Sequence, residues 1–351
     1  MPGLLTLGEL ALELVDIPSV SGEEQALNGW LAEQVRAQPH LQVIHQQADA
    51  LVFGLGGRPD VLLAGHSDTV PEQANLPGRL LDGFVHGLGA ADMKGALAVM
   101  LALASELTTA PRLNPLFMIF GGEELPQSNG VLEGLFGRCP SLLEAGLAVM
   151  MEPTANRLQA GCLGNIKAEL VFEGVAAHSA RPWLGVNAIH EAVRGLRDLV
   201  SLEPHDVVLE GLTFREVLSV TEMHAGIANN VVPDRAVCGL NFRYAGSRSP
   251  AEAEVRLREL VGAAGQLTVV GNAPSAPVPA GNHLLDRLRR AGDLALEPKQ
   301  AWTPVAEFAA HGLDAINFGP GDPQMAHRRD ERIAVDAMST SLEVLRRFLC
   351  S

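Results

Sequence analysis

The sequence predicts a two-domain protein. One domain is α/β, with a mixed, mostly parallel sheet flanked by helices, and the other is an inserted α+β domain of the ferredoxin-like type. Three observations predict this fold. The chain has 351 residues, more than one hydrophobic core usually organises. In its first half, continuous apolar runs alternate with helical patterns, which is typical of parallel strands buried on both faces. From about residue 165, the order of elements becomes β-α-β-β-α-β.

The first half of the chain supplies strands and helices of the α/β domain. Apolar runs at residues 51–57, 60–68, 115–124 and 147–153 predict strands, and the spacing of apolar residues over 93–108 predicts a helix. The N-terminal stretch carries acidic residues among its apolar ones and lacks a basic segment. It is therefore expected to form an amphipathic helix and not a signal peptide.

The second domain is expected to span residues 165–277. Its predicted elements, in chain order, are a strand at 165–174, a helix at 187–202, strands at 216–226 and 236–244, a helix at 249–265 and a strand at 266–271. Ser249 and Pro250 mark the start of the second helix, because serine caps helices and proline fits the first turn.

The α/β pattern returns after the proline-rich stretch at residues 272–282. The predicted elements that follow are helices at 284–296 and 303–312, a strand at 314–321 and an amphipathic helix at 338–350. The first domain is therefore predicted to be discontinuous, with residues 1–164 and 278–351.

Composition excludes several classes of function. The net charge of −15 and the pI near 5.2 argue against nucleic-acid binding, which requires clustered lysine and arginine. The longest apolar stretches, near 95–105 and 115–122, are shorter than the roughly 20 residues that span a bilayer. The four cysteines are widely separated, which favours free thiols in a reducing compartment. We therefore expect a cytoplasmic protein with no nucleic-acid or membrane partner.

Acidic and histidine residues follow the apolar strands at the points where those strands end. These residues are His66, Asp68, Asp92, Glu123, Glu124, Glu152 and His327. Each alone is typical of a turn. In an open parallel sheet, however, ligands bind at the carboxyl ends of the strands, so these segments are expected to converge. Two histidines and several carboxylates match the ligands of zinc, cobalt or manganese, in sufficient number for two metals about 4 Å apart.

Local spacing suggests how these residues divide their work. His66 and Asp68 stand at i and i+2 of an extended segment, so Asp68 can lie behind His66 and orient its ring. Glu123 and Glu124 are adjacent and point differently if the backbone is extended. One of them is then expected to bind metal and the other to take a proton from water.

The motifs as a set resemble a known family. They are GHSDTVP (65–71), GAADMKG (89–95), GGEE (121–124), MEPT (151–154), AAHSARP (176–182) and GPGDPQMAH (319–327). In this order and spacing, the chain resembles the di-zinc aminoacylase and carboxypeptidase family, within its group of acetylornithine deacetylases and succinyl-diaminopimelate desuccinylases. The resemblance covers nearly the whole chain. It implies a zinc-exopeptidase-like catalytic domain with an inserted lid and dimerisation domain.

The resemblance also implies roles for single residues. The implied metal ligands are His66, Asp92 and Glu152 for one zinc, and Asp92, Glu124 and His327 for the other. Glu123 would be the general base and Asp68 would orient His66. A cis peptide bond is expected between Asp92 and Met93.

The inserted domain carries the remaining implied residues. His178 resembles a histidine that reaches the active site of the partner subunit in a homodimer and stabilises the oxyanion. Asn229, Asn230 and Arg243 resemble substrate contacts, and arginine suits a carboxylate because its planar fork binds it bidentately. Taken alone, these residues also fit turns or an exposed strand position.

The reaction expected from the resemblance is removal of an N-acyl group from an amino acid. Within the family, the motifs are most similar to those of enzymes that cleave N-succinyl-LL-2,6-diaminopimelate. The segment around Thr303, a further expected substrate contact, reads WTPVAEF, where that group usually has WTDVARF. Pro304 and Glu307 therefore leave open a deacetylase of acetyl-ornithine, acetyl-lysine or acetyl-citrulline. A metallo-dipeptidase or carboxypeptidase also fits the metal ligands, and a zinc-binding protein without catalytic activity would keep the same fold.

Overall fold

A computed structural model describes residues 5–125 and 132–351, and it divides the chain into two units. The first unit contains Met1–Ala160, Pro279–Glu297 and Glu307–Ser351, and the second contains Gly161–Val278 and Pro298–Ala306. The α/β domain is thus discontinuous in sequence.

An eight-stranded sheet forms the centre of the first unit, in the order β1-β2-β6-β3-β7-β17-β8-β16. Its strands are β1 (Gln42–Gln47), β2 (Ala50–Gly54), β3 (Val61–His66), β6 (Pro115–Phe120), β7 (Leu147–Met150), β8 (Leu158–Ala160), β16 (Leu296–Pro298) and β17 (Ala315–Asn317). The four central strands β6, β3, β7 and β17 are parallel, whereas β2 pairs antiparallel with β6 and β8 pairs antiparallel with β17. The predicted mixed, mostly parallel sheet is confirmed.

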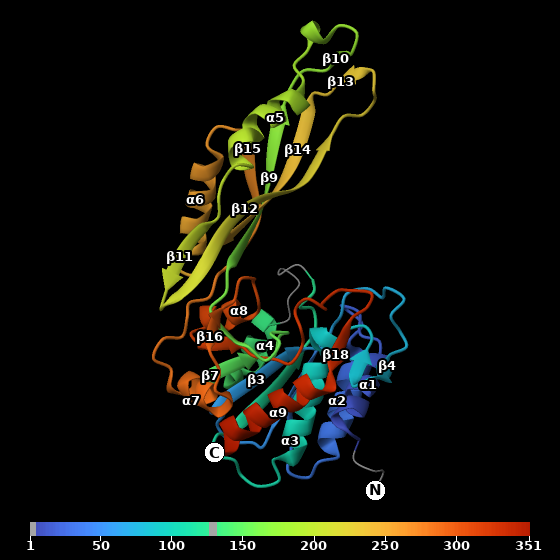
Figure 1. Cartoon of the computed structure of the whole chain (residues 1–351), viewed down its shortest axis with the longest axis vertical. Helices are drawn as coiled ribbons and strands as arrows, with labels where there is room; N and C mark the ends of the chain where they lie inside the picture. Colours follow the sequence, from blue (N-terminus) through green and yellow to red (C-terminus); the bar gives the residue numbers. More distant parts are fainter. Residues whose placement is uncertain (1–4, 126–131) are drawn as a thin grey trace. The chain divides into compact units, whose positions relative to one another are not determined.

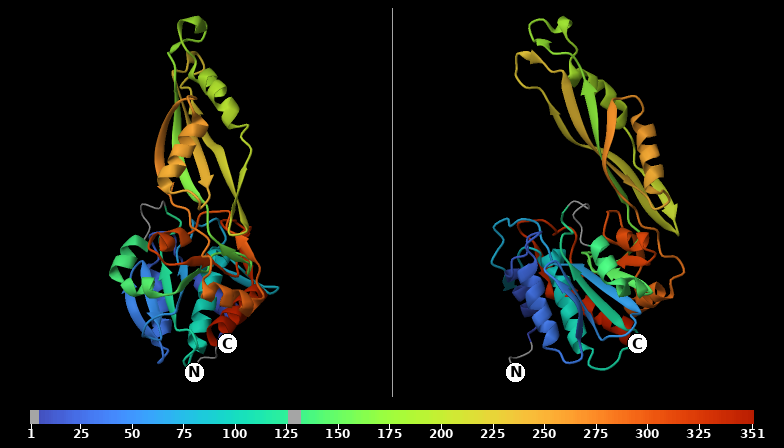
Figure 2. Two further views of the ribbon diagram at one scale, coloured as in Figure 1. Left: turned by 90° about the vertical axis from the view of Figure 1, so that its left-hand side faces the viewer. Right: turned by 180° about the vertical axis from the view of Figure 1, so that it is seen from behind.

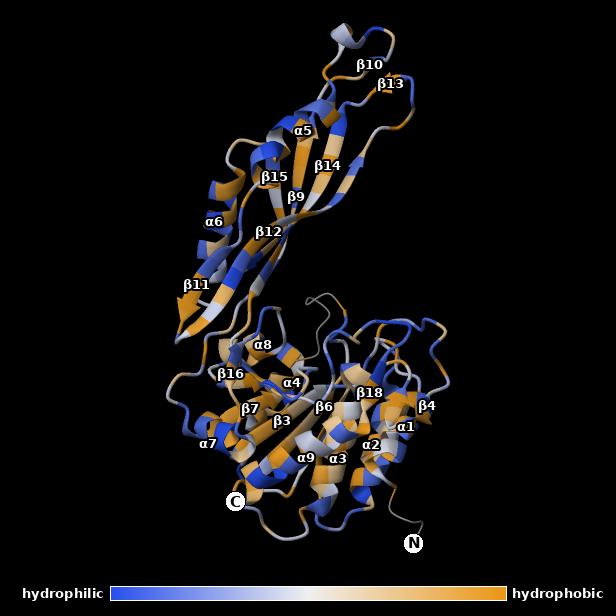
Figure 3. Cartoon of the chain, viewed as in Figure 1, coloured by the Kyte–Doolittle hydropathy of each residue, from blue (hydrophilic) through white to orange (hydrophobic). Residues whose placement is uncertain are grey.

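Apolar side chains explain why this sheet is central. Every residue of β2, β3, β6, β7 and β17 is buried, so these strands need cover on both faces. The helices of this unit are α1 (Leu7–Asp16), α2 (Gln25–Arg36), α3 (Gly95–Glu106), α4 (Leu132–Arg138), α7 (His283–Gly292), α9 (Val335–Cys350) and, from Glu307 onward, α8 (Val305–Ala310). They surround the sheet (Figure 1). Helices such as α7 and α9 carry both hydrophilic and hydrophobic residues (Figure 3), whereas α3 is apolar over most of its length and buried. No helix in the described parts of the chain has the length and apolarity needed to cross a membrane.

Short segments complete the first unit. They are β4 (Arg79–Leu81), β5 (Phe84–His86), β18 (Arg332–Ala334), the turn η1 (Ala90–Lys94) and the turn η3 (Pro140–Glu144). The strands form a small sheet in the order β18-β5-β4. Gly65 lets α3 approach β3, because a Cβ there would lie 2.6 Å from the Met93 Cε atom and 3.0 Å from a Leu97 methyl group.

The second unit has a five-stranded antiparallel sheet in the order β11-β12-β14-β9-β15. Its elements are β9 (Gly164–Glu173), β10 (Ala177–His178), η4 (Pro182–Leu184), α5 (Ala188–Leu199), β11 (His205–Leu209), β12 (Leu212–Ala225), β13 (Val231–Val232), β14 (Arg235–Tyr244), α6 (Pro250–Val261) and β15 (Gln266–Ala273). Without β11, the order β12-β14-β9-β15 is that of the predicted ferredoxin-like domain. Helices α5 and α6 pack on one face of this sheet (Figure 2).

Two features of this unit bear on the prediction. Strand β11 was not expected. It forms a hairpin with β12 through Glu210 and Gly211, whose positive φ angles of 50° and 79° suit a two-residue turn. The helix that begins at Pro250 follows the prediction, because Ser249 and Glu252 form a capping box around its first turn.

The expected boundary between the domains differs from the observed division. Residues 161–164 join the second unit, where Cys162 exchanges backbone hydrogen bonds with Ala276. Residues 298–306, which we expected in the first domain, do so as well. The Gln300 side chain accepts a hydrogen bond from the Arg215 amide at 3.1 Å and donates one to the Thr213 carbonyl at 2.8 Å. These contacts lie far apart in sequence, so no local pattern indicated them.

The packing of Tyr244 in the second unit leads to the first prediction. A Cβ on Gly164 would lie 2.2 Å from the Tyr244 ring. This ring is fully buried, and its hydroxyl donates to Asn272 Oδ1 at 2.9 Å and the Ala273 carbonyl at 3.0 Å. Because the ring cannot withdraw without losing these bonds, Gly164→Ala should destabilise the unit by about 2 kcal/mol. Thermal melting followed by circular dichroism measures the effect. Gly271→Ala is the matched control, since its Cβ meets open space, and equal melting temperatures for the two variants would contradict the prediction.

Candidate metal centre

Parallel strands bring the predicted site residues to one edge of the sheet in the first unit. His66 is the last residue of β3, Glu123 and Glu124 come soon after β6, and Glu152 comes soon after β7. Because β3 pairs in parallel with both β6 and β7, these strand ends lie at the same edge. Asp92 joins them from η1, and His327 from the loop between β17 and β18.

Potential ligand atoms from six residues converge there. Nitrogen and carboxylate oxygen atoms lie within 4.8 Å of one another in three groups of residues: His66, Asp92 and Glu152; Asp92, Glu124 and His327; and His66, Glu123 and Glu124. The first two groups are the two predicted ligand sets, and Asp92 belongs to both. Imidazole nitrogens and carboxylate oxygens together form a donor set that suits zinc, cobalt or manganese. The residues present therefore fit a pair of divalent cations.

His66 lies between two aspartates. Its Nε2 atom is 3.1 Å from Asp92 Oδ1, and its Nδ1 atom is 3.0 Å from the backbone carbonyl of Asp68 and 3.4 Å from the Asp68 carboxylate. Burial disfavours the charged imidazole, but the hydrogen bonds to Asp68 and Asp92 outweigh it and raise the pKa of His66 well above its usual value. The backbone carbonyl of Asp68 is thus nearer to the His66 ring than its carboxylate is.

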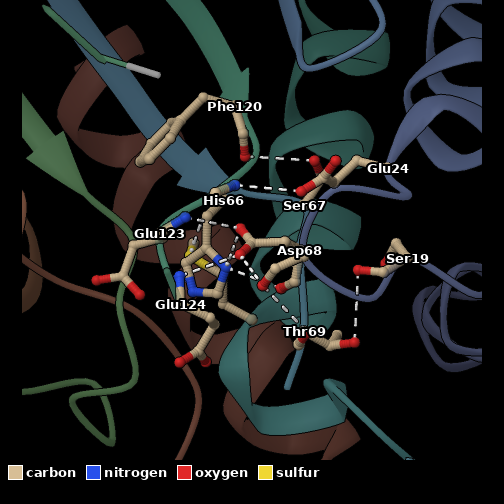
Figure 4. Close-up of polar contacts among 12 residues, drawn as sticks. Ser19, Glu24, His66, Ser67, Asp68, Thr69, Phe120, Glu123 and Glu124 are labelled. Atoms are coloured by element: carbon tan, nitrogen blue, oxygen red, sulfur yellow. Dashed lines mark hydrogen bonds and ion pairs between the residues drawn. The ribbon is translucent and has the colours of Figure 1, made fainter. Parts of the chain in front are cut away.

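The Asp68 carboxylate also holds the turn that carries the two glutamates. It accepts hydrogen bonds from the Glu123 amide at 3.1 Å and the Glu124 amide at 3.0 Å (Figure 4). It also accepts one from the Ser21 hydroxyl at 2.7 Å. Its side chain is fully buried. Burial acts to raise the Asp68 pKa, but the hydrogen bonds lower it below its ordinary value. Asp68 therefore stays ionised and fixes the backbone from which Glu123 and Glu124 project.

Glu123 is a carboxylate of this group that tends to hold a proton. Burial, followed by the nearby charge of Glu152, raises the pKa of Glu123 well above its usual value. A carboxyl group whose pKa is raised toward neutrality can both accept and return a proton. This is the property that we expected of one of the two adjacent glutamates.

His327 closes the second group of ligands. Its Nε2 atom lies 2.7 Å from Glu124 Oε1 and 3.5 Å from Asp92 Oδ2. Hydrogen bonds to Asp92 and Glu124 raise the pKa of His327 to about 10. Its side chain is 51% exposed whereas that of His66 is fully buried, so the two groups of ligands differ in their access to solvent.

Glu331 is a site residue that the sequence did not reveal. Its buried carboxylate accepts hydrogen bonds from the amides of Gly89 at 2.9 Å, Ala91 at 2.9 Å and Asp92 at 3.0 Å. It thereby holds the backbone of η1, in which the peptide bond between Asp92 and Met93 is cis as expected. Burial raises the pKa of Glu331 to about 7. Within the charged sequence RRDER (328–332), nothing distinguished this residue from a surface glutamate.

Lys94 also contributes from a buried position. Its ammonium group donates to the Ile17 carbonyl at 2.7 Å, at the end of α1, and burial lowers its pKa to about 8. This bond connects η1 to α1 and helps to fix the segment that presents Asp92.

The remaining predicted site residues belong to the second unit. His178 in β10 pairs with Val231 in β13, and the Ser179 amide donates to the Asn230 carbonyl at 3.0 Å. His178, Asn229 and Asn230 are therefore neighbours on one exposed ribbon. The structure thus groups one expected catalytic residue with two expected substrate contacts.

Arg243 and Thr303 lie elsewhere in the second unit. Arg243 is half-buried and its Nε atom donates to Asn241 Oδ1 at 2.9 Å; burial lowers its pKa. Thr303 is buried, and its carbonyl lies 3.9 Å from the Cys162 sulfur. The sequence predicts Thr303 in the first domain, but Thr303 groups with the second unit because the whole segment 298–306 does.

Comparisons with known proteins agree on one family. The model of the family described as "Peptidase family M20/M25/M40" matches residues 62–351. A protein of Corynebacterium glutamicum called "Succinyl-diaminopimelate desuccinylase" is 38% identical, over 99% of this chain and 98% of its own length. A Mycobacterium tuberculosis protein called "Putative succinyl-diaminopimelate desuccinylase DapE" is 37% identical, over 97% of both chains.

Solved structures share the fold. A metallo-carboxypeptidase of the M20 family from Sulfolobus solfataricus superimposes with a TM-score of 0.79 at 18% identity, over 98% of both chains. The aminopeptidase PepT from Bacillus cereus gives a TM-score of 0.78 at 18% identity, over 98% of this chain and 97% of its own. At these identities the likeness shows a common fold.

The hydrogen bonds of Asp68 lead to the second prediction. Both oxygens of the Asp68 carboxylate accept hydrogen bonds, whereas an asparagine side chain has only one oxygen. In Asp68→Asn, the NH₂ group would therefore face an amide or hydroxyl donor and leave that donor unpaired. We expect a loss of stability of about 1–3 kcal/mol and a lower content of bound metal, because the turn with Glu123 and Glu124 loses its support. Thermal melting and elemental analysis after dialysis against Zn²⁺ measure both. Asp234→Asn, at an exposed position, is the control, and an Asp68→Asn protein that matches it in both measurements would disprove this role.

Proposed function

Because the chain belongs to Peptidase family M20/M25/M40, we propose that it is a two-metal amidohydrolase that converts N-succinyl-LL-2,6-diaminopimelate into succinate and LL-2,6-diaminopimelate. The observation that supports a two-metal reaction is that two groups of candidate metal ligands share Asp92. The relatives at 37–38% identity over nearly the full length support the choice of substrate, since both carry the name of this desuccinylase.

Two zinc ions are the proposed cofactors, and cobalt or manganese suits the same donors. His66, Asp92 and Glu152 would hold one ion, and Asp92, Glu124 and His327 the other. Such a pair lowers the pKa of a bound water and polarises the substrate carbonyl. The crowding of four carboxylates around two histidines supports this assignment, because like charges at this spacing need counter-charges.

Glu123 is proposed to move the proton. Its raised pKa suits a group that takes a proton from the attacking water and returns it to the leaving amine. Asp68 keeps Glu123 in position through the backbone amide of that residue. Hydrolysis of the amide then yields one carboxylate and one free amine.

The second unit is proposed to bind the substrate and a second copy of the chain. Arg243 would bind a substrate carboxylate, and Asn229, Asn230 and Thr303 would contact the amino-acid part. His178 of the second copy would donate to the oxyanion. Exposed apolar side chains near His178 support a homodimer through this unit, with Trp183 at 76% and Ile227 at 89% exposure. Four unpaired cysteines suit a reducing cytoplasm.

The third prediction concerns substrate and base. The wild-type protein with Zn²⁺ should release amine faster from N-succinyl-LL-2,6-diaminopimelate than from acetyl-ornithine, acetyl-lysine or a dipeptide. Glu123→Gln should keep its metal but lose activity by about a thousandfold, because the general base is gone. Steady-state assays of amine release, with elemental analysis of metal content, measure both effects. A faster rate on an acetylated substrate or a dipeptide would overturn the proposed substrate, and an unchanged rate for Glu123→Gln would overturn the proposed base.

The fourth prediction concerns the dimer. Glu123→Gln and His178→Ala proteins should each be inactive, but a mixture of the two should recover activity. In a mixed dimer, one site combines an intact Glu123 with an intact His178, so an equal mixture should reach about a quarter of wild-type activity if subunits exchange freely in a two-fold dimer. Unfolding and refolding the proteins together ensures exchange. Mixed dimers that form but remain inactive would refute a catalytic role for His178 across subunits.

A further inference from the structure

His327 has an unusual backbone for a residue with a large side chain. Its φ angle is 60°, in the left-handed region. Residues other than glycine adopt this region infrequently, and the surrounding structure must then hold them there. His327 also lies in an exposed stretch, since residues 327–330 are all exposed. Something other than burial must therefore fix the direction of its imidazole.

Side chains from the loop after β3 contact the backbone at this position. The Gln73 side chain donates from Nε2 to the His327 carbonyl at 3.0 Å, and the Asn75 side chain donates from Nδ2 to the Arg328 carbonyl at 3.4 Å. The two also act together, because the Asn75 Oδ1 atom accepts from the Gln73 amide at 3.1 Å. Both are half-buried. We call these two residues the 73–75 clamp.

We propose that the 73–75 clamp positions His327 and thereby sets the affinity of the metal site formed by Asp92, Glu124 and His327. Gln73 and Asn75 are positioning residues, since they contact the backbone of the ligand and not the reacting atoms. The inference rests on the proposed two-metal function.

The geometry makes the effect selective for one site. The clamp contacts the carbonyls of residues 327 and 328, whereas His66 and Glu152 are presented by β3 and β7. Asp92 is held by bonds from the amides of Ala91 and Asp92 to the Glu331 side chain, which neither residue of the clamp contacts. The Glu331 amide also donates to the Arg328 carbonyl at 3.2 Å, so this turn keeps a bond within its own loop when the clamp is lost. Loss of the clamp should therefore leave the site of His66, Asp92 and Glu152 intact. The same reasoning makes the site of His327 the weaker of the two, because its histidine is half-exposed while His66 is buried.

Stepwise metal binding tests this inference. Calorimetric titration of the EDTA-stripped, full-length protein with Zn²⁺ should show two steps. Gln73→Met keeps the length of the side chain but removes its donor, and we expect the weaker step to lose about fivefold in affinity while the tighter step stays unchanged. Adding Asn75→Ala should bring the loss to about twenty-five-fold, if the two hydrogen bonds contribute equally. His327→Ala identifies the step, because it should abolish the weaker one.

Gln47→Met is the matched control, since Gln47 is exposed in β1 and remote in sequence from the loop of His327. Thermal melting of each stripped protein checks that the fold is kept. A wild-type protein that binds fewer than two Zn²⁺ ions would overturn the two-metal proposal itself. If the wild-type protein shows two binding steps and Gln73→Met changes neither of them, or weakens both equally, the proposed role of the clamp is wrong. The two-metal proposal would then still stand.

Discussion

Negative charge concentrated at one edge of a parallel sheet is the constraint around which the first unit is organised. Asp92, Glu123, Glu124 and Glu152 meet there because the strands or turns before them end at the same edge. Carboxylates so close together repel one another. Burial and this repulsion, chiefly from Glu152, together raise the pKa of Glu123. His66 and His327 offset part of it, and two cations would offset the rest.

The backbone around this edge is fixed by two further carboxylates that face amides. Asp68 accepts bonds from the amides of Glu123 and Glu124, and Glu331 accepts bonds from the amides of Gly89, Ala91 and Asp92. Each of the two is thus satisfied by hydrogen bonds and does not compete for the same cations. Buried carboxylates have two functions in this unit: one set presents oxygen atoms to the proposed metals, and the other shapes the turns that carry that set.

The two proposed metal sites are supported unequally. His66 is buried in the sheet, and its position follows from the packing of β3. His327 is on an exposed loop, and its backbone carbonyl is bonded by a side chain 254 residues earlier in the sequence. An exposed hydrogen bond contributes less than a packed strand, so the second site depends on contacts that a small change in a loop can alter.

The sequence by itself determined the main strands and helices of both units, the mixed sheet, the ferredoxin-like insertion, and the residues expected to meet at the sheet edge. It did so because periodic apolar runs, the helix-start residues Ser249 and Pro250, and motifs at strand ends are local patterns. The tertiary structure alone decided that Glu331 holds η1, that Gln73 and Asn75 contact the loop of His327, and that residues 298–306 join the second unit. Each of these depends on contacts between residues far apart in the chain. A single polar residue in a charged or turn-like segment carries no local sign of the distant backbone that it will bind.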